Sequence, residues 1–329
     1  MLVLGIARCA GGPEAPQARG PLLLVSDRGG ALRIYDVAPG ESAARLIGSP
    51  GSADAAYLDS MPARLPDGRI VFVSDRDGAP QIYLADPSGR NAARLTIDPP
   101  GAGRPAASAP APLGRDRIVF ARTDPGAPPG APRDLYVIRL DGSGLRRLTR
   151  GADDDSAPAG SPDGRSVVFV SDRSGAPHLY LMAELDAADP EAGLVDLSRA
   201  APPAPGSPAA SLPYADGAPA FLTDGSIVFS RTPAGGQPHL FQIGAAASRF
   251  TLRQITDPVT LPYGADEPVL LQDGSLLFVT GGTERPAAGK DKPVHAAVYR
   301  ITLGGFNLVR VTRDQARYSD FTRRLPPRP

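Results

Sequence analysis

Five aspartates stand at a repeated place in the chain, each just before a short apolar stretch. Carboxylates that a repeating fold gathers around one opening create a negative potential, which can hold a cation such as Ca²⁺ or attract a basic peptide. An aspartate that begins a strand can equally cap its own turn and hydrogen-bond within its own repeat. Repetition copies both kinds of residue, so both interpretations stay open. The candidate acidic ring consists of Asp59, Asp155, Asp216, Asp266 and Asp320.

The histidines are the other side chains suited to metal binding, and the chain has three: His178, His239 and His295. His178 and His239 hold the same place in their repeats, directly before an apolar–aromatic pair. A shared metal would need both imidazoles on one ion. Gln81 holds this place in another copy, so we interpret the position as the polar start of a strand. No metal or other cofactor is predicted from the histidines, and a divalent cation is considered only for the acidic ring.

Nucleophilic catalysis has little support in the sequence. No Gly-x-Ser-x-Gly elbow occurs, and the repeats leave no room for a separate hydrolase domain. The aspartates of three Ser-Asp-Arg triplets, Asp27, Asp75 and Asp172, are predicted to tie strand corners through hydrogen bonds. The recurring Asp-Gly pairs fit the positive φ of tight hairpin turns. We therefore predict that the chain is not an enzyme.

The elements that position these residues form a repeat. Residues 161–181 read SPDGRSVVFVSDRSGAPHLYL, and residues 65–84 read LPDGRIVFVSDRDGAPQIYL. Each copy holds a turn, an apolar strand, a polar corner, a Gly-Pro turn and an apolar–aromatic strand, which is the pattern of a hairpin. The motif returns after about 48 residues. Six copies with four short strands each predict an all-β fold, a six-bladed β-propeller.

The two ends of the repeat region predict how the ring closes. The first copy begins at Pro21 without a first strand, whereas residues 318–325 follow the sixth copy and contain Asp320. We expect this C-terminal strand to complete the first blade, because closure removes two open sheet edges. The prediction is one propeller domain over residues 21–329, preceded by a signal remnant or flexible tether over residues 1–20. Two insertions, 186–211 and 281–294, are expected to be surface loops.

Composition narrows the class of protein. Of 329 residues, 35 are Lys or Arg and 35 are Asp or Glu, a balance that argues against nucleic-acid binding. The single cysteine, Cys9, excludes an intrachain disulfide and a cysteine metal cage. No apolar run approaches the roughly 20 residues of a transmembrane helix. The 37 glycines and 38 prolines accompany a period, so we assign them to turns.

The N-terminus resembles the end of a bacterial lipoprotein signal. Apolar residues 1–7 precede Arg8 and Cys9, and a Gly/Pro/Ala-rich stretch follows. Two features depart from that pattern: no basic segment precedes the apolar run, and Arg8 stands where a small residue is expected. We predict an exported protein, periplasmic or anchored to the outer membrane, with Cys9 as candidate lipidation site. The alternative is a disordered tail with an ordinary cysteine.

The repeat also resembles a known family. The pattern Asp-x-x-Pro, Pro-Asp-Gly, Val-Phe-Val-Ser-Asp-Arg, Ile-Tyr, Arg-Leu-Thr is similar to the repeat of TolB-type propellers, which include envelope proteins of the Tol–Pal system. The resemblance covers residues 21–325 and is strongest in copies two and four. The family often has Trp three residues before the Asp of Pro-Asp-Gly, whereas this chain has Arg64 and Gly160 there and no Trp at all. Nor is there an obvious counterpart of the additional N-terminal domain of TolB.

Two function classes follow from these observations. The first is a non-catalytic, monomeric propeller of the cell envelope that binds a protein or peptide partner at its acidic channel mouth. The second is a propeller enzyme, a lyase or hydrolase that acts on a small molecule or polysaccharide with a divalent cation in the channel. A melting temperature that rises with Ca²⁺ or Mg²⁺ would favour the second.

Overall fold

The computed structural model describes residues 2–3, 22–26, 33–37, 45–47, 57–98, 105–200, 213–246, 249–271, 274–280, 297–304 and 308–310. These residues form six antiparallel sheets of four strands each, in chain order. The first three sheets consist of β1 (Leu2–Val3), β2 (Leu22–Ser26), β3 (Arg33–Val37), β4 (Arg45–Leu46), β5 (Asp59–Arg64), β6 (Ile70–Ser74), β7 (Gln81–Ala85), β8 (Ala93–Arg94), β9 (Ala107–Leu113), β10 (Arg117–Thr123), β11 (Arg133–Arg139) and β12 (Arg146–Arg147).

The last three sheets follow the same order. A 3₁₀ turn, η2 (Pro190–Gly193), and a one-turn helix, α1 (Leu197–Ala200), flank the fourth strand of the fourth sheet. The expected loop 186–211 therefore contains secondary structure in its described part, and the expected loop 281–294 lies outside the described residues. The strands are β13 (Asp155–Gly160), β14 (Val167–Ser171), β15 (His178–Met182), β16 (Val195–Asp196), β17 (Tyr214–Phe221), β18 (Ile227–Pro233), β19 (His239–Ala246), β20 (Arg249–Gln254), β21 (Asp266–Leu270), β22 (Ser275–Thr280), β23 (Ala297–Thr302) and β24 (Val309–Arg310).

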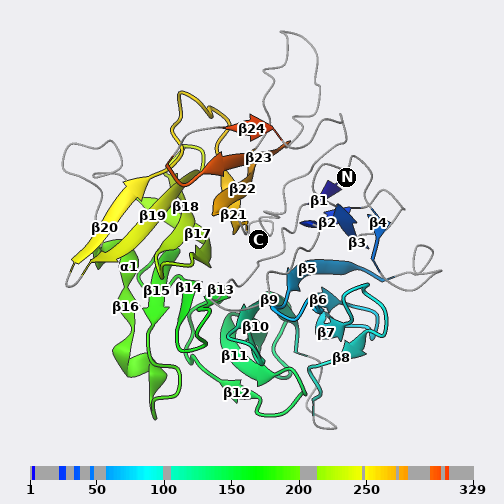
Figure 1. The fold of residues 1–329 in the computed structure, drawn as a ribbon. Coiled ribbons are helices and arrows are strands. Elements are labelled where there is room, and N and C mark those ends of the chain that lie inside the picture. Colours follow the sequence, from blue (N-terminus) through cyan, green and yellow to red (C-terminus); the bar gives the residue numbers. More distant parts are fainter. Residues whose placement is uncertain are drawn as a thin grey trace.

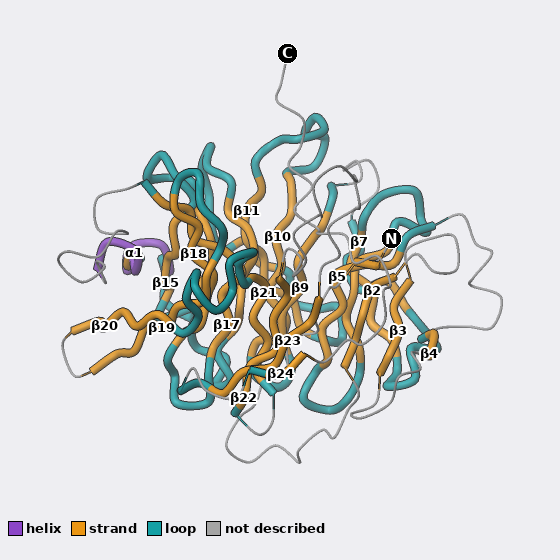
Figure 2. The backbone as a smooth tube through the Cα atoms, turned by 90° about the horizontal axis from the view of Figure 1, so that it is seen from above, coloured by secondary structure: helices purple, strands orange, loops and turns teal. Residues whose placement is uncertain are grey.

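The sheets are arranged around a centre, as in a propeller. The first strands of the second to sixth sheets lie innermost, and their fourth strands lie at the periphery (Figure 1). Seen from above, the strands form a central band with loops on both sides (Figure 2). The expected all-β propeller is confirmed. Contact between the sixth and the first sheet, which would close the ring, is not seen among the described residues.

The edge of the first sheet differs from our expectation. The strand beside β2 is β1, with Leu2 opposite Ser26 and Val3 opposite Val25. A C-terminal strand was expected in this place, but residues 311–329 lie outside the described part of the chain. An open edge offers unpaired N–H and C=O groups to any extended segment, and the apolar N-terminal segment meets that requirement here.

The second to sixth blades each have an aromatic pair at their middle. In five sheets an aromatic side chain on the second strand faces one on the third strand across the ladder, with ring centroids 5.9–6.0 Å apart. Such cross-strand pairs stabilise a sheet and suit the pleated, half-buried surface of a strand. The pairs are Phe72–Tyr83, Phe120–Tyr136, Phe169–Tyr180, Phe229–Phe241 and Phe278–Tyr299.

The core lies between neighbouring sheets. One cluster joins Val71 and Ile82 of the second sheet to Ile118 of the third, and all three side chains are fully buried. Another joins Leu135 of the third sheet to Phe169 of the fourth. Because each sheet buries both faces against its neighbours, the second strands are continuous apolar runs rather than alternating ones. This arrangement explains the Ile-Val-Phe and Val-Val-Phe sequences of the repeat.

Gly160 explains one departure from the family pattern. A Cβ at this position would stand 2.3 Å from the carbonyl oxygen of Pro112 and 2.8 Å from the Cα of Leu113. The third and fourth sheets therefore meet backbone to backbone, and no side chain fits between them. The Trp that the family often places here is excluded by this contact.

The innermost strands share a bulge with an unusual backbone. In five successive sheets the register shifts near the start of the first strand. The residue at the bulge precedes a proline and has a left-handed φ of 44° to 53°, although none of the five is glycine. L-residues avoid this region, so the bulge is a strained feature repeated around the ring. The five residues are Met61, Ala109, Ala157, Ala218 and Glu267.

Candidate functional site

The described aspartates of the candidate acidic ring lie on one side of the propeller. We call the side on which each first strand begins the leading face, and the other side the trailing face. Because the strands of a blade alternate in direction, the leading face also carries the turns from second to third strands and the connections from one blade to the next. Asp59 and Asp155 begin β5 and β13, and Asp216 lies near the start of β17.

Asp216 forms a buried ion pair within its own blade. Its two carboxylate oxygens accept hydrogen bonds from Arg231 Nε at 2.6 Å and Nη2 at 2.7 Å. Ser198 donates a further hydrogen bond of 2.5 Å to Oδ2. The side chains are 1% and 0% exposed, and the guanidinium lies 3.9 Å from the ring centroid of Tyr214. Both charges are therefore compensated inside the protein, as burial requires.

Asp155 and Asp59 form weaker versions of the same contact. Arg173 Nη2 donates to both oxygens of Asp155, at 3.1 and 3.0 Å. Arg76 Nη2 donates to Asp59 at 3.0 Å. These arginines come from the Ser-Asp-Arg corners and are 21% and 25% exposed. Each guanidinium also lies over the aromatic pair of its blade, a favourable cation–π contact.

The third blade, which has no aspartate at the repeat position, obtains its carboxylate from elsewhere. Ala107 takes that position, and Arg122 occupies the opposite place on β10. Arg122 forms an ion pair with Asp98, a residue of the connection between the second and third blades. Its guanidinium lies over Tyr136. The second to fifth blades thus share an arginine, a carboxylate and an aromatic ring, which we call the Arg–Asp corner.

Asp266 does not occupy the ring position. Only one residue separates it from Pro268, whereas two separate Asp59, Asp155 and Asp216 from their prolines. Ala265 therefore takes the buried place, and Asp266 pairs with Val279 one step along the strand. Its Oδ1 accepts the N–H of Glu267 at 2.7 Å. The proline spacing is the signal in the sequence that distinguishes this copy.

The other aspartates of the repeat have structural contacts. Asp75 accepts the backbone N–H of Leu58 at 2.6 Å, and Asp172 accepts that of Asp154 at 2.8 Å. Each ties the corner of its blade to the chain entering the first strand, so the predicted structural role of these two is confirmed. Asp27, Asp320 and Cys9 lie outside the described residues. The geometry of Asp59, Asp155 and Asp216 favours the structural interpretation that we kept open for the ring.

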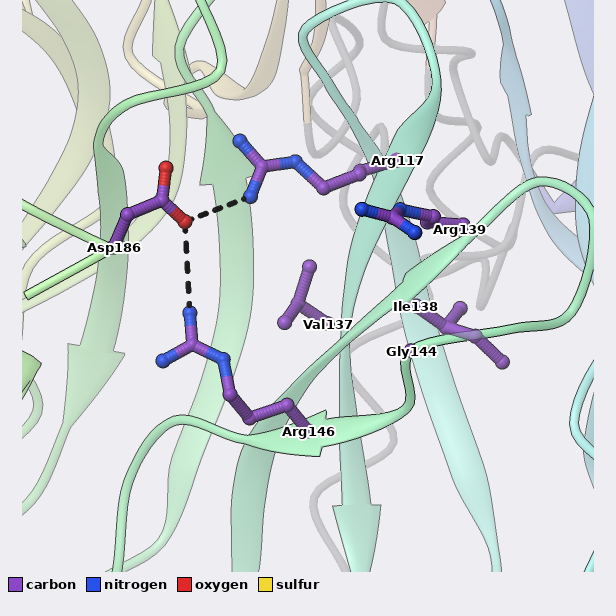
Figure 3. Close-up of a pocket in the computed structure, with 7 residues that line it drawn as sticks. All are labelled: Arg117, Val137, Ile138, Arg139, Gly144, Arg146 and Asp186. Carbon is purple, nitrogen blue, oxygen red and sulfur yellow. Dashed lines mark hydrogen bonds and ion pairs between the residues drawn. The ribbon is translucent and has the colours of Figure 1, made fainter. Parts of the chain in front are cut away.

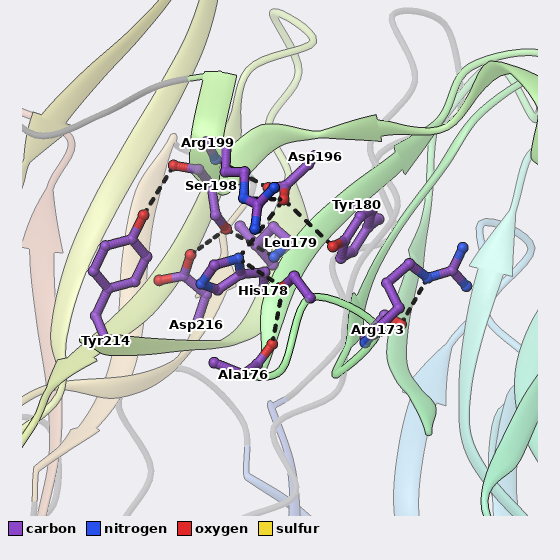
Figure 4. A network of polar contacts seen from close by, with 12 residues as sticks. Arg173, Ala176, His178, Leu179, Tyr180, Asp196, Ser198, Arg199, Tyr214 and Asp216 are labelled. Carbon is purple, nitrogen blue, oxygen red and sulfur yellow. Dashed lines mark hydrogen bonds and ion pairs between the residues drawn. The ribbon is translucent and has the colours of Figure 1, made fainter. Parts of the chain in front are cut away.

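His178 lies in a polar network between the fourth and fifth blades (Figure 4). Its Nδ1 is 3.0 Å from Ser174 Oγ and 3.7 Å from Asp196 Oδ2. A hydrolytic triad uses one imidazole nitrogen for the carboxylate and the other for the nucleophile, whereas both contacts here are made by Nδ1. The imidazole also stacks on Tyr214, with centroids 5.3 Å apart. The network joins two blades and lacks the geometry of a triad.

His239 holds the equivalent place in the fifth blade and is buried. Burial lowers its pKa, an effect that the nearby Asp257 opposes. Its Nδ1 has no hydrogen-bond partner among the described residues. His295 lies outside them. In the described part of the chain, no three His, Cys, Asp or Glu side chains are grouped as metal ligands.

Asp134 takes this same place in the third blade and forms an ion pair with Arg147. Burial raises the pKa of Asp134 to about 6, although Arg147 acts in the opposite direction. A polar residue therefore lies at or next to the start of the third strand in the second to fifth sheets, but the residue type changes from blade to blade: Gln81, Asp134, His178 and His239.

A surface pocket of about 260 Å³ lies on the trailing face between the third and fourth blades (Figure 3). Three arginines and one aspartate line it above an apolar floor. Sequence reasoning missed this site because its charged residues come from three strands of the third blade and a connection of the fourth, and they meet only when the two blades pack. The lining residues are Arg117, Val137, Ile138, Arg139, Gly144, Arg146 and Asp186.

Comparison with known sequences gives short matches. No protein-family profile matches the chain. A stretch of 47 residues is 47% identical to the Tol-Pal system protein TolB of Bordetella pertussis, which is 14% of this chain and 11% of that protein. A stretch of 50 residues is 38% identical to a TolB homolog of Chlorobium luteolum, 15% of this chain and 12% of that protein. The matches thus span a small fraction of each relative.

Comparison with solved structures gives matches over most of the chain. TolB from Acinetobacter baumannii superposes with a TM-score of 0.56 at 17% identity, over 91% of this chain and 60% of that one. An oligogalacturonate lyase in complex with manganese gives 0.59 at 14% identity, over 96% and 78%. A puromycin-hydrolyzing peptidase of Mycobacterium tuberculosis gives 0.57 at 17%, over 94% and 45%. At these identities the likeness establishes the fold, and with the short sequence matches it makes the chain a TolB-like β-propeller. No described helix is long and apolar enough to cross a membrane.

Proposed function

We propose that this TolB-like propeller is a non-catalytic binding protein of the bacterial cell envelope and that it presents its leading face to a protein or peptide partner. The supporting observation is which side chains of that face are engaged in contacts within the protein and which are exposed. Its buried carboxylates are already paired with arginines, so they hold the blades together instead of meeting as reactive groups. In addition to charged side chains, the face exposes several large apolar side chains to solvent.

Three large apolar side chains on the connections of the leading face are exposed: Leu58 by 44%, Ile97 by 75% and Val259 by 91%. Val259 is held outward by a tight turn, in which Asp257 Oδ1 accepts the N–H groups of Val259 and Thr260 at 2.9 and 3.0 Å. Exposed apolar side chains that are fixed in place are typical of protein-binding surfaces. Leu145, 40% exposed, lies on the trailing face and provides a comparison.

The proposal is tested by capture of a partner from the cell envelope by crosslinking. The chain carrying Leu58→Ser, Ile97→Ser and Val259→Ser together should lose a partner that the unaltered chain captures. The Leu145→Ser variant should keep it, because its exposed side chain is on the other face. Thermal unfolding of each variant checks that the fold persists. Equal capture by the triple variant would contradict binding at the leading face.

Within this proposal the acidic ring has a smaller part than the sequence indicated. Asp59, Asp155 and Asp216 are committed to their Arg–Asp corners, so their carboxylates are already occupied by arginines of their own blades. The five-residue ring including Asp320 stays a prediction.

The alternative function is a propeller enzyme that acts on a small molecule or polysaccharide with a bound divalent cation. The fold shared with the manganese-containing lyase is the reason to test it. A cation bound only by the folded chain raises the melting temperature. A melting temperature that rises on addition of millimolar Ca²⁺, Mg²⁺ or Mn²⁺ would support the enzyme. An unchanged melting temperature would favour the non-catalytic binding protein.

Export, lipid attachment at Cys9 and the monomeric state are part of the same proposal, as is ring closure by a C-terminal strand. Two deletions separate the candidates for the closing strand. If residues 318–325 pair with β2, removing residues 316–329 lowers the melting temperature and removing residues 1–20 does not. If β1 holds the edge, the two results are reversed.

A further inference from the structure

We infer that the pocket between the third and fourth blades, on the trailing face, is a binding site for a phosphate group. This site is remote from the leading face and independent of the function proposed for it. The inference starts from an excess of positive charge in a small concave space. The guanidinium groups of Arg117, Arg139 and Arg146 line the pocket together with one carboxylate, that of Asp186, which contacts Arg117 and Arg146 (Figure 3).

Two of the arginines are fixed by the protein backbone. Arg117 Nη2 donates to the carbonyl oxygen of Gly164 at 2.7 Å. Arg146 Nη2 donates to the carbonyl oxygen of Leu185 at 2.6 Å. Both carbonyls belong to the fourth blade, while both arginines belong to the third. The guanidinium groups are therefore oriented by the joint between the blades, and they need no anion to hold their positions.

Asp186 is a replaceable counter-charge. Its Oδ1 accepts a hydrogen bond from Arg117 Nη1 at 3.1 Å and lies 3.9 Å from Arg146 Nη2. The side chain is 71% exposed, so it can turn away into water at little cost. An incoming oxyanion can take its place between the same two guanidinium groups.

Arg139 supplies a further donor. Its side chain is exposed, and its guanidinium has no hydrogen bond or ion pair in the described part of the chain. Asp141 follows in the same turn, but its Oδ1 accepts the Ser143 N–H at 2.9 Å and the Ser143 hydroxyl at 2.7 Å. The pKa of Asp141 is lowered mainly by these two hydrogen bonds. The positive charge of Arg139 lowers it to a smaller degree. The tip of Arg139 thus stays available for a ligand.

The chemistry of this donor set fits phosphate. Arginine donates in a planar fork that matches the oxygens of a phosphate group, and charge-assisted pairs of this kind are strong. The volume is below the roughly 300–1,000 Å³ of drug-sized ligand pockets, so it suits one anionic group rather than a large molecule. The buried floor of Val137 and Ile138 adds no acceptor side chain that would compete.

The phosphate could be a free small molecule or the headgroup of a phospholipid, and two arms of one experiment distinguish them. The first arm is calorimetric titration of the full chain with inorganic phosphate at constant ionic strength, with acetate as comparator. The second is sedimentation with vesicles of phosphatidylglycerol, with phosphatidylcholine vesicles as comparator. Wild-type protein should bind in at least one arm and ignore the comparator.

Variants connect the binding to the pocket. Arg139→Gln should weaken it about tenfold, since a charged hydrogen bond is lost, and Asp186→Asn should strengthen it because the competing carboxylate is gone. Arg150→Gln, which removes an exposed arginine outside the pocket, should change nothing. Absence of binding in both arms, or equal loss in Arg139→Gln and Arg150→Gln, would overturn the inference. The triple variant of the leading face should bind phosphate normally, so the two proposals fail separately.

Discussion

The Arg–Asp corners and the trailing-face pocket use the same two residue types in opposite ways. In a corner one arginine meets one buried aspartate and an aromatic ring, as Arg231 meets Asp216 and Tyr214. In the pocket three arginines are accompanied by one aspartate, the exposed Asp186, which contacts two of them. The corners recur in successive blades, and each pairs its positive charge with a negative one. The pocket lies at a single joint between blades and has more positive than negative side chains. The difference suggests that repeated charges hold this fold together and that a ligand is to be sought where the repetition ends.

The largest effect is expected at the most buried corner. Asp216→Asn leaves the Arg231 charge buried without a counter-charge, and the free energy of unfolding should fall by about 3–5 kcal/mol. Urea denaturation at pH 7 measures this change. The double variant Asp216→Asn with Arg231→Met should regain a large part of the loss, because no isolated charge remains. A loss of less than about 1 kcal/mol in the single variant would show that the Arg–Asp corners contribute little to stability.

A smaller effect is expected at the second blade. Asp59→Asn should lower the free energy of unfolding by about 1.5–3 kcal/mol, since Arg76 is 25% exposed and can regain water. The matched control is Asp67→Asn, which breaks the exposed pair of Asp67 with Arg69 at 2.7 Å and should change stability by less than about 1 kcal/mol. Equal effects of the two substitutions would contradict the distinction between corner and surface pairs.

The third blade adds a dependence on pH. The pKa of Asp134 is about 6 in the folded chain against a usual 3.8, so the folded state binds this proton more tightly than the unfolded state. The resulting stabilisation is complete below pH 4 and is lost as the pH rises through 6, on the order of 2 kcal/mol. Asp134→Asn should remove this part of the pH profile in chemical denaturation. Superimposable profiles of variant and wild type between pH 4 and 7 would contradict the raised pKa.

The smallest effect is expected in the pocket. Asp186→Asn should leave the free energy of unfolding within about 0.5 kcal/mol of the wild-type value, because an exposed ion pair contributes little. Thermal unfolding in phosphate-free buffer measures this. A loss as large as that of Asp59→Asn would mean that Asp186 is a structural anchor, and its role as a replaceable counter-charge would then be wrong.

The sequence predicted those features of the fold that every copy of the repeat contains. The period and the alternation of turns with apolar strands indicated the propeller because each blade obeys the same local rules of turn and strand formation. The corner role of Asp75 and Asp172 followed from the same copies. Where a copy departs by one residue, the repeat is a poorer guide: Asp266 begins β21 as Asp59 begins β5, but its spacing to Pro268 places it one step further along the strand.

The rest depends on contacts between blades, which no single repeat contains. Asp98 pairs with Arg122 of the third blade but lies in the connection that precedes this blade. The sequence of the third copy therefore does not predict the contact. The pocket brings Arg117, Arg146 and Asp186 together only after two blades have packed. The strand beside β2 was likewise a choice between two chain ends, and local sequence does not decide which end pairs with an open edge.

The left-handed residues before the innermost prolines have a consequence for anyone who wishes to engineer this scaffold. Each of Met61, Ala109, Ala157, Ala218 and Glu267 holds a backbone conformation that disfavours an L-residue by about 1–2 kcal/mol. Glycine would adopt the same conformation without that penalty. Part of the stabilisation would be offset because glycine raises the conformational entropy of the unfolded chain. The second to sixth blades thus each contain one position at which a glycine substitution is expected to raise thermal stability, and these substitutions can be introduced singly or together.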